Sequence, residues 1–391
     1  MSDDRRLQLV APCHFGLEAV VKRELQSLGF SVLGTTDGRV IFAGDAAGIV
    51  RANIHLRSAE RVLLRVGHLS VHTPDDLFEA VQELPWEDYL PRDAAFPVVK
   101  AVGIRSRLFA PQMIQRTVQK ASVLRMSRHY GMEHFPMDGA SYPIRVFIMN
   151  DEADICLDTT GESLHKRGYR KSNVMAPIAE NLAASLIMLT PWRADRILVD
   201  PFCGSGTFLI EAALMAANIA PGIHRSFLSE QWTELIPPAL WKECRREAYA
   251  AIDPDVETDL QGYDIDPQAI EVAKIAAQEA GVEELVHFQV RDVADLSHRK
   301  KYGFLLTNPP YGERLGAEDE KALFRLYQTL GERYRALDDW SMYLITSYPD
   351  AERAIGKKAD KNRKLYNGMI ETRFYQYLGA KPPRRTDRGS T

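Results

Sequence analysis

The spacing of apolar positions changes character near residue 172. From there to about residue 380, short apolar runs alternate with stretches that have the period of an amphipathic helix. The runs predict strands at 197–201, 260–265, 286–291, 304–307, 342–346 and 370–377, and the helical patterns include 267–280 and 321–334. Buried strands separated by helices are typical of a doubly wound α/β fold with a mostly parallel sheet.

The first 165 residues lack this regular alternation. Residues 15–28 have the pattern of an amphipathic helix, and an extended segment follows through residue 42. A helix is predicted at 111–130, where Pro111 fits the first turn, and strands are predicted at 144–149 and 155–157. This mixture indicates an α+β region before the α/β region.

Two further segments stand apart from these patterns. Residues 218–259 separate the first two strands of the α/β region and contain two consecutive prolines, so we expect an inserted helical segment. The tail 381–391 is short and basic, and we expect it to be disordered.

Composition narrows the class of protein. At roughly 100–200 residues per domain, a chain of this length predicts two or three domains. The four cysteines form no CxxC pair and no cluster with zinc-like spacing, which favours a reduced, cytoplasmic protein without a metal. The N-terminus lacks the apolar core of a signal peptide, and no apolar stretch is long enough to cross a membrane.

The net charge of −4 hides local basic clusters. Residues 94–132 contain seven cations and no Asp or Glu: Lys100, Arg105, Arg107, Arg116, Lys120, Arg125 and Arg128. A second cluster at 166–171 includes Arg167 and Arg170, and a third spans 357–364. A solvated helix face would also carry such a run, but the absence of compensating acids in 94–132 favours contacts with the phosphates of a nucleic acid. For 166–171, an interdomain linker and an RNA contact remain equally open.

A glycine-containing loop follows the first strand of the α/β region. Gly204 and Gly206 would let the backbone approach a ligand closely, at the edge where open α/β sheets bind ligands. Asp200 beside this loop would repel a pyrophosphate and attract the ammonium group of a methionine moiety. Asp264 ends the next strand, where it could accept from ribose hydroxyls, and Asp292 ends the third, where it could accept from an adenine amino group.

These features predict an S-adenosylmethionine site, although the glycines could form only a turn and the acids could cap helices. The spacing of the acids also departs from the dinucleotide fingerprint. The predicted cofactor contacts are Asp200, Pro201, Phe202, Cys203, Gly204, Ser205, Gly206, Thr207, Asp264, Ile265, Asp292, Val293 and Asn308.

The fourth strand ends in the tetrapeptide Asn308, Pro309, Pro310 and Tyr311. Two prolines end the strand and hold the chain in a fixed turn. Such a turn could aim the Asn308 amide and the Pro309 carbonyl at the two N–H bonds of an exocyclic amino group, while Tyr311 stacks on the base. A paired base would have to be flipped out of its helix to reach this pocket. An ordinary loop is the alternative, and the upstream cofactor pattern argues against it.

Three motifs in order, DPFCGSGTFLIEAA, GYDIDPQAI and TNPPYGER, resemble the THUMP-domain class I RNA guanine-N2 methyltransferases. Bacterial members of that family methylate 23S ribosomal RNA, and archaeal and eukaryotic relatives act on tRNA. The resemblance implies S-adenosylmethionine as methyl donor, RNA as partner and guanine N2 as target. Bifunctional members carry a second methyltransferase domain after the region matched here, so only the guanine-N2 activity is implied.

The resemblance extends over nearly the whole chain. Residues 163–187 resemble the bridge into the catalytic domain, which would place Ala176 and Pro177 near the methionine end of the cofactor, and 362–377 resemble the final β-hairpin. The implied organisation is a ferredoxin-like lobe at 1–55, a THUMP domain at 56–160 and a Rossmann-like domain with a seven-stranded sheet at 161–380. Within this frame the predicted RNA contacts are Lys100, Arg105, Arg107, Arg116, Lys120, Arg167 and Arg170.

Several alternatives stay open from the sequence. The tetrapeptide's chemistry also suits adenine N6, in DNA or RNA, and the amide nitrogen of a protein glutamine. A tRNA substrate, an RNA-binding factor with a silent catalytic domain, and a monomeric or dimeric state are likewise compatible with the residues.

Overall fold

The computed structural model describes residues 6–132, 135, 138–170, 178–311, 317–368 and 370–382. The contacts divide the chain into two compact units. One contains the segments up to Cys13, Leu17–Leu164 and Pro221–Ala250, and the other contains His14–Gly16, His165–Ala220 and the chain from Ala251. The predicted disordered tail lies outside the described residues from 383 onward. Among the described residues, no helix combines the length and apolar character needed to cross a bilayer.

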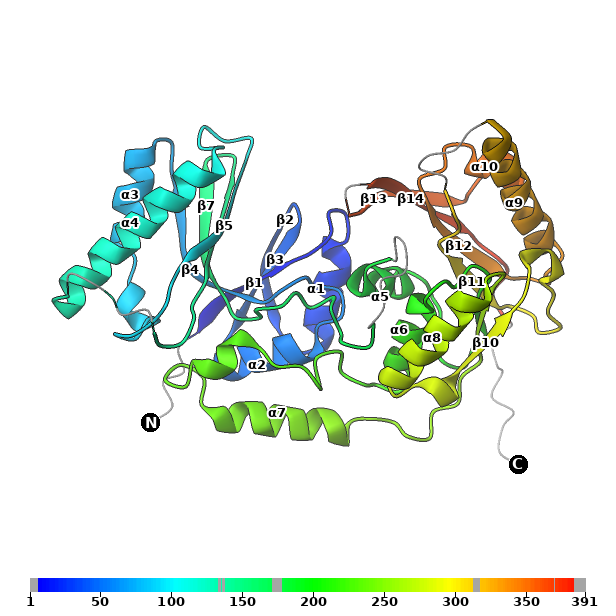
Figure 1. Cartoon of the computed structure of the whole chain (residues 1–391), viewed down its shortest axis with the longest axis horizontal. Helices are drawn as coiled ribbons and strands as arrows, with labels where there is room; N and C mark the ends of the chain where they lie inside the picture. Colours follow the sequence, from blue (N-terminus) through cyan, green and yellow to red (C-terminus); the bar gives the residue numbers. More distant parts are fainter. Residues whose placement is uncertain are drawn as a thin grey trace, which may run out of the picture. The chain divides into compact units, whose positions relative to one another are not determined.

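The first unit contains a single seven-stranded sheet in the order β2-β3-β1-β4-β7-β6-β5 (Figure 1). Every neighbouring pair is antiparallel except β5 and β6. The strands are β1 (Leu7–Pro12), β2 (Ser31–Thr36), β3 (Arg39–Gly44), β4 (Leu63–Ser70), β5 (Val98–Ile104), β6 (Ile144–Met149) and β7 (Glu152–Asp158). The α-helices are α1 (Glu18–Ser27), α2 (Ala46–His55), α3 (Pro74–Gln82), α4 (Pro111–Tyr130) and α7 (Pro238–Ala250).

Local sequence explains several of these boundaries. Asp45 accepts the Gly48 N–H at the start of α2, and Thr73 and Asp76 form a capping box on α3. The segment predicted as extended to residue 42 is a hairpin of β2 and β3, because Gly38 adopts a positive φ of 74° at the turn. The predicted helix 111–130 and strand 144–149 are confirmed.

The segment between residues 221 and 250 packs with the first unit, although it lies between two strands of the second. The predicted helical insertion is confirmed as α7, which begins at Pro238 and contacts α2. Loop hydrogen bonds also join the segment to this unit, from the Gly222 N–H to the Ile54 carbonyl and from Trp232 Nε1 to the Ser141 carbonyl. The segment therefore belongs to the first unit by its contacts, while the main division between the units falls between Leu164 and His165.

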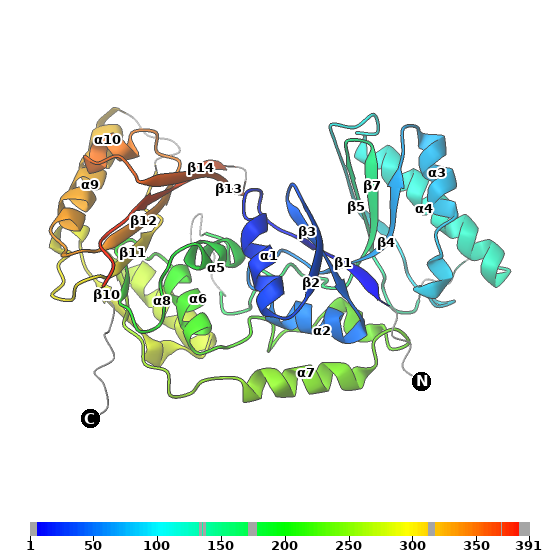
Figure 2. The same cartoon turned by 180° about the vertical axis from the view of Figure 1, so that it is seen from behind.

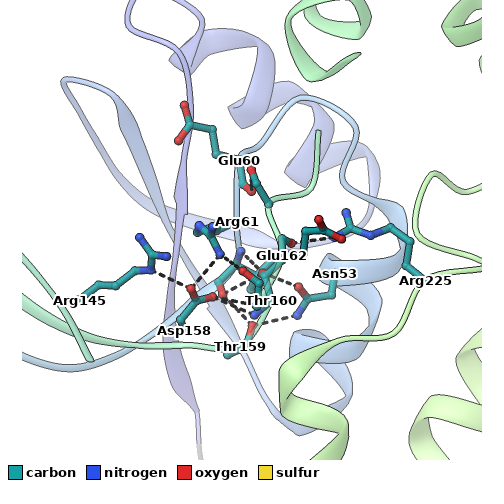
Figure 3. A network of polar contacts seen from close by, with 12 residues as sticks. Asn53, Glu60, Arg61, Arg145, Asp158, Thr159, Thr160, Glu162 and Arg225 are labelled. Atoms are coloured by element: carbon teal, nitrogen blue, oxygen red, sulfur yellow. Dashed lines mark hydrogen bonds and ion pairs between the residues drawn. The ribbon is translucent and has the colours of Figure 1, made fainter. Parts of the chain in front are cut away.

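A buried polar network closes the end of β7 in the first unit (Figure 3). The buried carboxylate of Asp158 pairs with Arg61 at 2.8 Å and Arg145 at 2.7 Å, and accepts the Thr160 N–H at 3.0 Å. Thr160 in turn donates to Asn53 of α2 at 2.7 Å. These bonds tie α2 to the strand that ends more than a hundred residues later.

The second unit is a doubly wound α/β sheet in the order β10-β9-β8-β11-β12-β14-β13. Its strands are β8 (Leu198–Asp200), β9 (Leu260–Asp264), β10 (Val286–Val290), β11 (Phe304–Thr307), β12 (Ser341–Thr346), β13 (Lys361–Asn367) and β14 (Ile370–Tyr377). The first five are parallel, and β14 is antiparallel to both β12 and β13. The predicted fold class is confirmed, and the predicted strand ends in this unit shift by one residue at most.

Helices cover both faces of this sheet. They are α5 (Glu180–Met188), α6 (Thr207–Ala216), α8 (Pro267–Glu279), α9 (Ala317–Arg335) and α10 (Ala351–Ile355). Figures 1 and 2 show α5, α6 and α8 on one side of the sheet and α9 and α10 on the other. The core on the α9 side joins Val199 and Leu305 of the sheet to Tyr327 and Leu330 of the helix.

Candidate active site

The predicted cofactor and catalytic residues gather at one edge of the second sheet. Strands β10, β9, β8 and β11 are adjacent and parallel, so their carboxyl ends lie along the same edge. Asp264 is the last residue of β9 and Asp200 the last of β8, while Asn308 follows β11 directly and Asp292 follows β10 after one residue. The fold thus brings together side chains that are up to 108 positions apart.

Asp200 is a buried carboxylate at this edge. Its carboxylate accepts hydrogen bonds from Thr307 Oγ1 at 2.6 Å and from the Phe202 N–H at 3.1 Å. Burial raises the pKa of Asp200 to about 7 despite these two bonds, and the charge of Asp264 adds to the rise. A cationic group placed here would offset the cost of the buried charge.

The loop after Asp200 needs its glycines for two different reasons. Gly204 and Gly206 both adopt positive φ, 50° and 75°. A Cβ on Gly206 would lie 2.6 Å from the Phe288 ring, so close packing excludes a side chain there. A Cβ on Gly204 would meet nothing within 4 Å among the residues that the structure describes. The free space beside Gly204 is where a ligand could approach the backbone.

The other two acids differ in what they bind within the protein. Asp264 accepts the Gly204 N–H at 3.0 Å, so its carboxylate faces the glycine loop, and Asp266 caps α8 instead. Asp292 accepts the Ala294 N–H at 2.8 Å and caps a short 3-10 turn. Asp292 therefore caps a turn, whereas Asp264 joins the glycine loop to the start of α8, because its other oxygen accepts the Asp266 N–H at 3.0 Å.

Two apolar neighbours of these acids have opposite environments. The Ile265 side chain is 69% exposed, which leaves an apolar surface free at this edge. Val293 is buried in the core beneath the sheet edge, so it could contact a ligand only through its backbone.

The tetrapeptide turn presents an unsatisfied acceptor. Asn308 Oδ1 is buried and has no hydrogen-bond partner within the described part of the chain. Such an atom is costly unless a ligand donates to it. Tyr311 packs against the core on the α9 side, and its hydroxyl accepts from Asn367 Nδ2 at 3.4 Å. Within the described ranges, no group of His, Cys, Asp or Glu side chains is placed to hold a metal ion.

The predicted RNA contacts of the first unit lie on exposed positions of β5, α4 and the loop between them: Lys100, Arg105, Arg107, Arg116 and Lys120. Arg116 and Lys120 line a groove of about 590 Å³ beside Val98 and Leu124. Two cations of the run have acid partners: Arg125 pairs with the Glu87 carboxylate at 2.5 Å, and the exposed Arg107 pairs with Asp151 at 3.7 Å. The basic run at 94–132 contains no compensating acid because Glu87 precedes it in the sequence.

The structure encloses Arg167, one of the predicted RNA contacts. Its side chain is 3% exposed and pairs with the buried Glu211 carboxylate of α6 at 3.3 Å. Arg170 is also largely enclosed and donates to Thr207 Oγ1 at 3.1 Å and to the Ile178 carbonyl at 2.9 Å. These two arginines brace the start of α6. Ala176 and Pro177 lie outside the described residues.

Two side chains at this edge were not anticipated from the sequence. Thr307 binds Asp200, and a polar residue at the end of an otherwise apolar strand was the available signal. Tyr327 of α9 donates to the Pro310 carbonyl at 3.1 Å. It occupies an ordinary apolar position of an amphipathic helix, so nothing in the sequence pattern distinguishes it.

Three models of known protein families match successive parts of the chain. The model of the RMKL-like methyltransferase domain matches residues 167–376. The RlmL ferredoxin-like domain matches residues 8–63, and the THUMP domain matches 71–158. The chain belongs to the RMKL-like methyltransferase family. Its THUMP and ferredoxin-like regions agree with the resemblance seen in the sequence.

Two curated proteins are similar to this chain over most of its length. "Putative RNA methyltransferase YpsC" of Bacillus subtilis (strain 168) is 41% identical over 97% of this chain and 98% of its own length. "Ribosomal RNA large subunit methyltransferase K/L" of Allochromatium vinosum is 35% identical over 94% of this chain. The family member spans only 51% of that second protein.

Solved structures of family relatives share the whole fold. "SMU.472, a putative methyltransferase complexed with SAH" is 40% identical, with a TM-score of 0.90 over 97% of this chain and all of the other. A "predicted N6-adenine-specific DNA methylase" from Listeria monocytogenes str. 4b F2365 is 45% identical, with a TM-score of 0.89 over 96% of this chain and 97% of the other.

Proposed function

We propose that this protein transfers a methyl group from S-adenosylmethionine to the exocyclic N2 of a guanine in RNA, with 23S ribosomal RNA as the substrate. The observation that carries the proposal is the buried Oδ1 of Asn308, which has no hydrogen-bond partner among the described residues and lies at the same sheet edge as the carboxylates that end β8 and β9. An amide oxygen that can accept a hydrogen bond, at the sheet edge where the ligand would bind, fits methylation of an amino nitrogen.

The residues present fit this methyl donor. Asp200 would face the ammonium group, the backbone beside Gly204 the methionine chain, Asp264 the ribose hydroxyls and Asp292 the adenine amino group. Ile265 would supply apolar contact to the adenine ring. When bound, the sulfonium of S-adenosylmethionine supplies an electrophilic methyl group. The complex of the 40%-identical relative with SAH supports this assignment.

The target nitrogen would be held by the turn after β11. The Asn308 amide oxygen and the Pro309 carbonyl would each accept one N–H of the exocyclic amino group, which orients its lone pair away from the base ring. Tyr311 would stack on the base. As the nitrogen gains the methyl group it would lose one proton to solvent, and S-adenosylhomocysteine would be left. Because no group in the turn needs to ionise before this step, catalysis would depend on positioning and fixed dipoles.

RNA is the proposed substrate class because of the THUMP match and the names of the curated relatives. Lys100, Arg105, Arg107, Arg116 and Lys120 would contact phosphates from their exposed positions. The choice of 23S RNA and of guanine N2 follows the K/L relative and the family resemblance, since the turn suits adenine N6 equally.

Adenine N6 in DNA is the second candidate, favoured by the name of the Listeria relative. The two are separated by incubating the protein with tritiated S-adenosylmethionine and RNA or DNA from a strain that lacks the gene. The nucleic acid is then digested and the labelled nucleoside identified. Label in N2-methylguanosine of RNA is expected. Label in N6-methyladenine of DNA, or no label in either, would overturn the proposal.

Asn308→Ala should strongly reduce methyl transfer while leaving cofactor binding intact. The alanine removes the amide acceptor, and we expect kcat to fall by about 10²–10³-fold, the scale for loss of one preorganised polar group. The dissociation constant for S-adenosylmethionine, measured by calorimetry, should change little. Loss of cofactor binding in a folded variant would instead show that Asn308 serves mainly the cofactor.

A further inference from the structure

Tyr327 joins helix α9 to the catalytic turn. Its side chain is fully buried, and its hydroxyl donates to the Pro310 carbonyl at 3.1 Å. The two prolines of the turn have no N–H, so they cannot hold it through strand hydrogen bonds. The Pro310 carbonyl is therefore one of the few backbone groups through which a hydrogen bond can fix the turn.

A second bond fixes the Tyr327 hydroxyl itself. Thr346, the last residue of β12, has its Oγ1 2.6 Å from Tyr327 Oη, and this Oγ1 also accepts the Tyr348 N–H at 3.0 Å. A carbonyl can only accept, so the single hydroxyl hydrogen of Tyr327 points to Pro310, and Thr346 must donate to Tyr327. The bonds form one chain from the Tyr348 N–H through both hydroxyls to the turn.

The surroundings keep this chain rigid and protonated. The ring of Tyr327 lies 4.9 Å from that of Tyr348, centroid to centroid, and Tyr311 of the turn packs against the same core. Burial holds the pKa of Tyr327 well above its usual range, so the phenol keeps its proton. Thr346 is 1% exposed, which shields the bonds from water.

We propose that Tyr327 is a positioning residue for methyl transfer, and that it holds the Pro310 carbonyl so that the Asn308 amide and the Pro309 carbonyl keep their aim. This inference rests on the proposed function of the turn. It gives Tyr327 a role in the rate of transfer without contact with cofactor or base.

The test compares Tyr327→Phe with Tyr334→Phe. Tyr334 lies seven residues further along α9, is also buried, and donates its hydroxyl to the Tyr377 carbonyl at 3.4 Å, away from the turn. Both variants keep the ring and lose one buried hydroxyl. For Tyr327→Phe we expect kcat on RNA to fall about tenfold, because a small misplacement of reacting groups is costly. Its KM for RNA and its affinity for S-adenosylmethionine should stay within about twofold of the wild type, because Tyr327 contacts neither substrate.

A third variant, Thr346→Val, removes the donor to Tyr327 but leaves the bond to Pro310. A smaller fall in kcat, about threefold, is expected, since the tyrosine loses support but keeps its contact. A fall equal to that of Tyr334→Phe would show that the chain of bonds does not extend to Thr346.

Hydrogen exchange provides a readout that needs no RNA substrate. In the peptide 304–311, amide exchange should be faster in Tyr327→Phe than in the wild type or Tyr334→Phe. Unchanged exchange, or a kcat no lower than that of Tyr334→Phe in an active enzyme, would overturn the positioning role. If the wild type methylates no RNA but exchange responds as expected, the proposed function fails while Tyr327 still holds the turn.

Discussion

At the scale of single residues, the buried carboxyl of Asp200 is the most unusual group of the site. It lies at the end of β8 with 2% of its surface exposed, and its partners are a hydroxyl and a backbone N–H instead of a cation. Burial therefore dominates and brings the pKa of Asp200 to about 7. A bound ammonium group would supply the missing positive charge.

The affinity for S-adenosylmethionine should consequently depend on pH. Above about pH 7 the carboxyl is ionised and ready for the ammonium group, while below it a proton must first leave. The dissociation constant should rise about tenfold for each pH unit below 7 and level off above it. Calorimetry between pH 5.5 and 8.5 would measure this.

Asp200→Asn is the control for that titration. The variant should bind S-adenosylmethionine more weakly because it lacks the carboxylate. Its affinity should depend little on pH over the same range, because no group titrates at position 200. A flat profile for the wild type, or the same slope in the variant, would assign the titration to another group.

At the scale of elements, the helices and strands are joined by polar contacts that the apolar pattern does not encode. In Figure 3 the network around Asp158 connects the end of β7, Arg61 just before β4, and helix α2. Asp158 is 2% exposed, and both its arginine partners are mostly enclosed. Removing the carboxylate would leave two enclosed cations without their shared anion.

We expect Asp158→Ala to lower the free energy of unfolding of the first unit by about 3–5 kcal/mol, the range for breaking a buried ion pair on one side. Urea denaturation followed by tryptophan fluorescence would measure it. Glu243→Ala is the matched control in the same unit, because Glu243 forms an exposed pair with Arg246 on α7 and should matter little. Equal effects of the two variants would refute the structural role given to Asp158.

At the scale of the whole molecule, charge is distributed unevenly over a chain of net charge −4. The exposed cations of β5 and α4 concentrate on the first unit, whereas Arg167 and Arg170 of the second unit are used internally. Of these two groups, the first is exposed to a polyanion. The groove beside Arg116 and Lys120 is accordingly where RNA phosphates are expected.

Arg116→Glu with Lys120→Glu should weaken RNA binding and flatten its dependence on salt. Loss of two phosphate contacts would reduce the slope of log K against log salt by about 1.4–1.8. Filter binding between 50 and 300 mM salt would measure the slope. Lys274→Glu with Lys301→Glu makes the same charge change at exposed positions of the second unit and should leave the slope nearly unchanged. Equal slopes in both double variants would make α4 an ordinary solvated face.

The sequence by itself determined the architecture of the second unit and the edge where its site lies. Alternating apolar runs located the strands within one residue, because a buried parallel strand must be almost wholly apolar. The residues that follow parallel strands share one edge of a sheet, so Asp200, Asp264 and Asn308 could be grouped before any coordinates existed. The family motifs then agreed with the matched family model.

Only the tertiary structure decided which of these side chains touch. Thr307 reaches Asp200 across 107 residues, Arg167 reaches Glu211 across 44, and the segment 221–250 packs with the unit that precedes it in the chain. Tyr327 supports the turn from a helix position that any apolar residue could fill. Periodicity reports whether a side chain is buried, but its partner depends on long-range packing, which no local pattern contains.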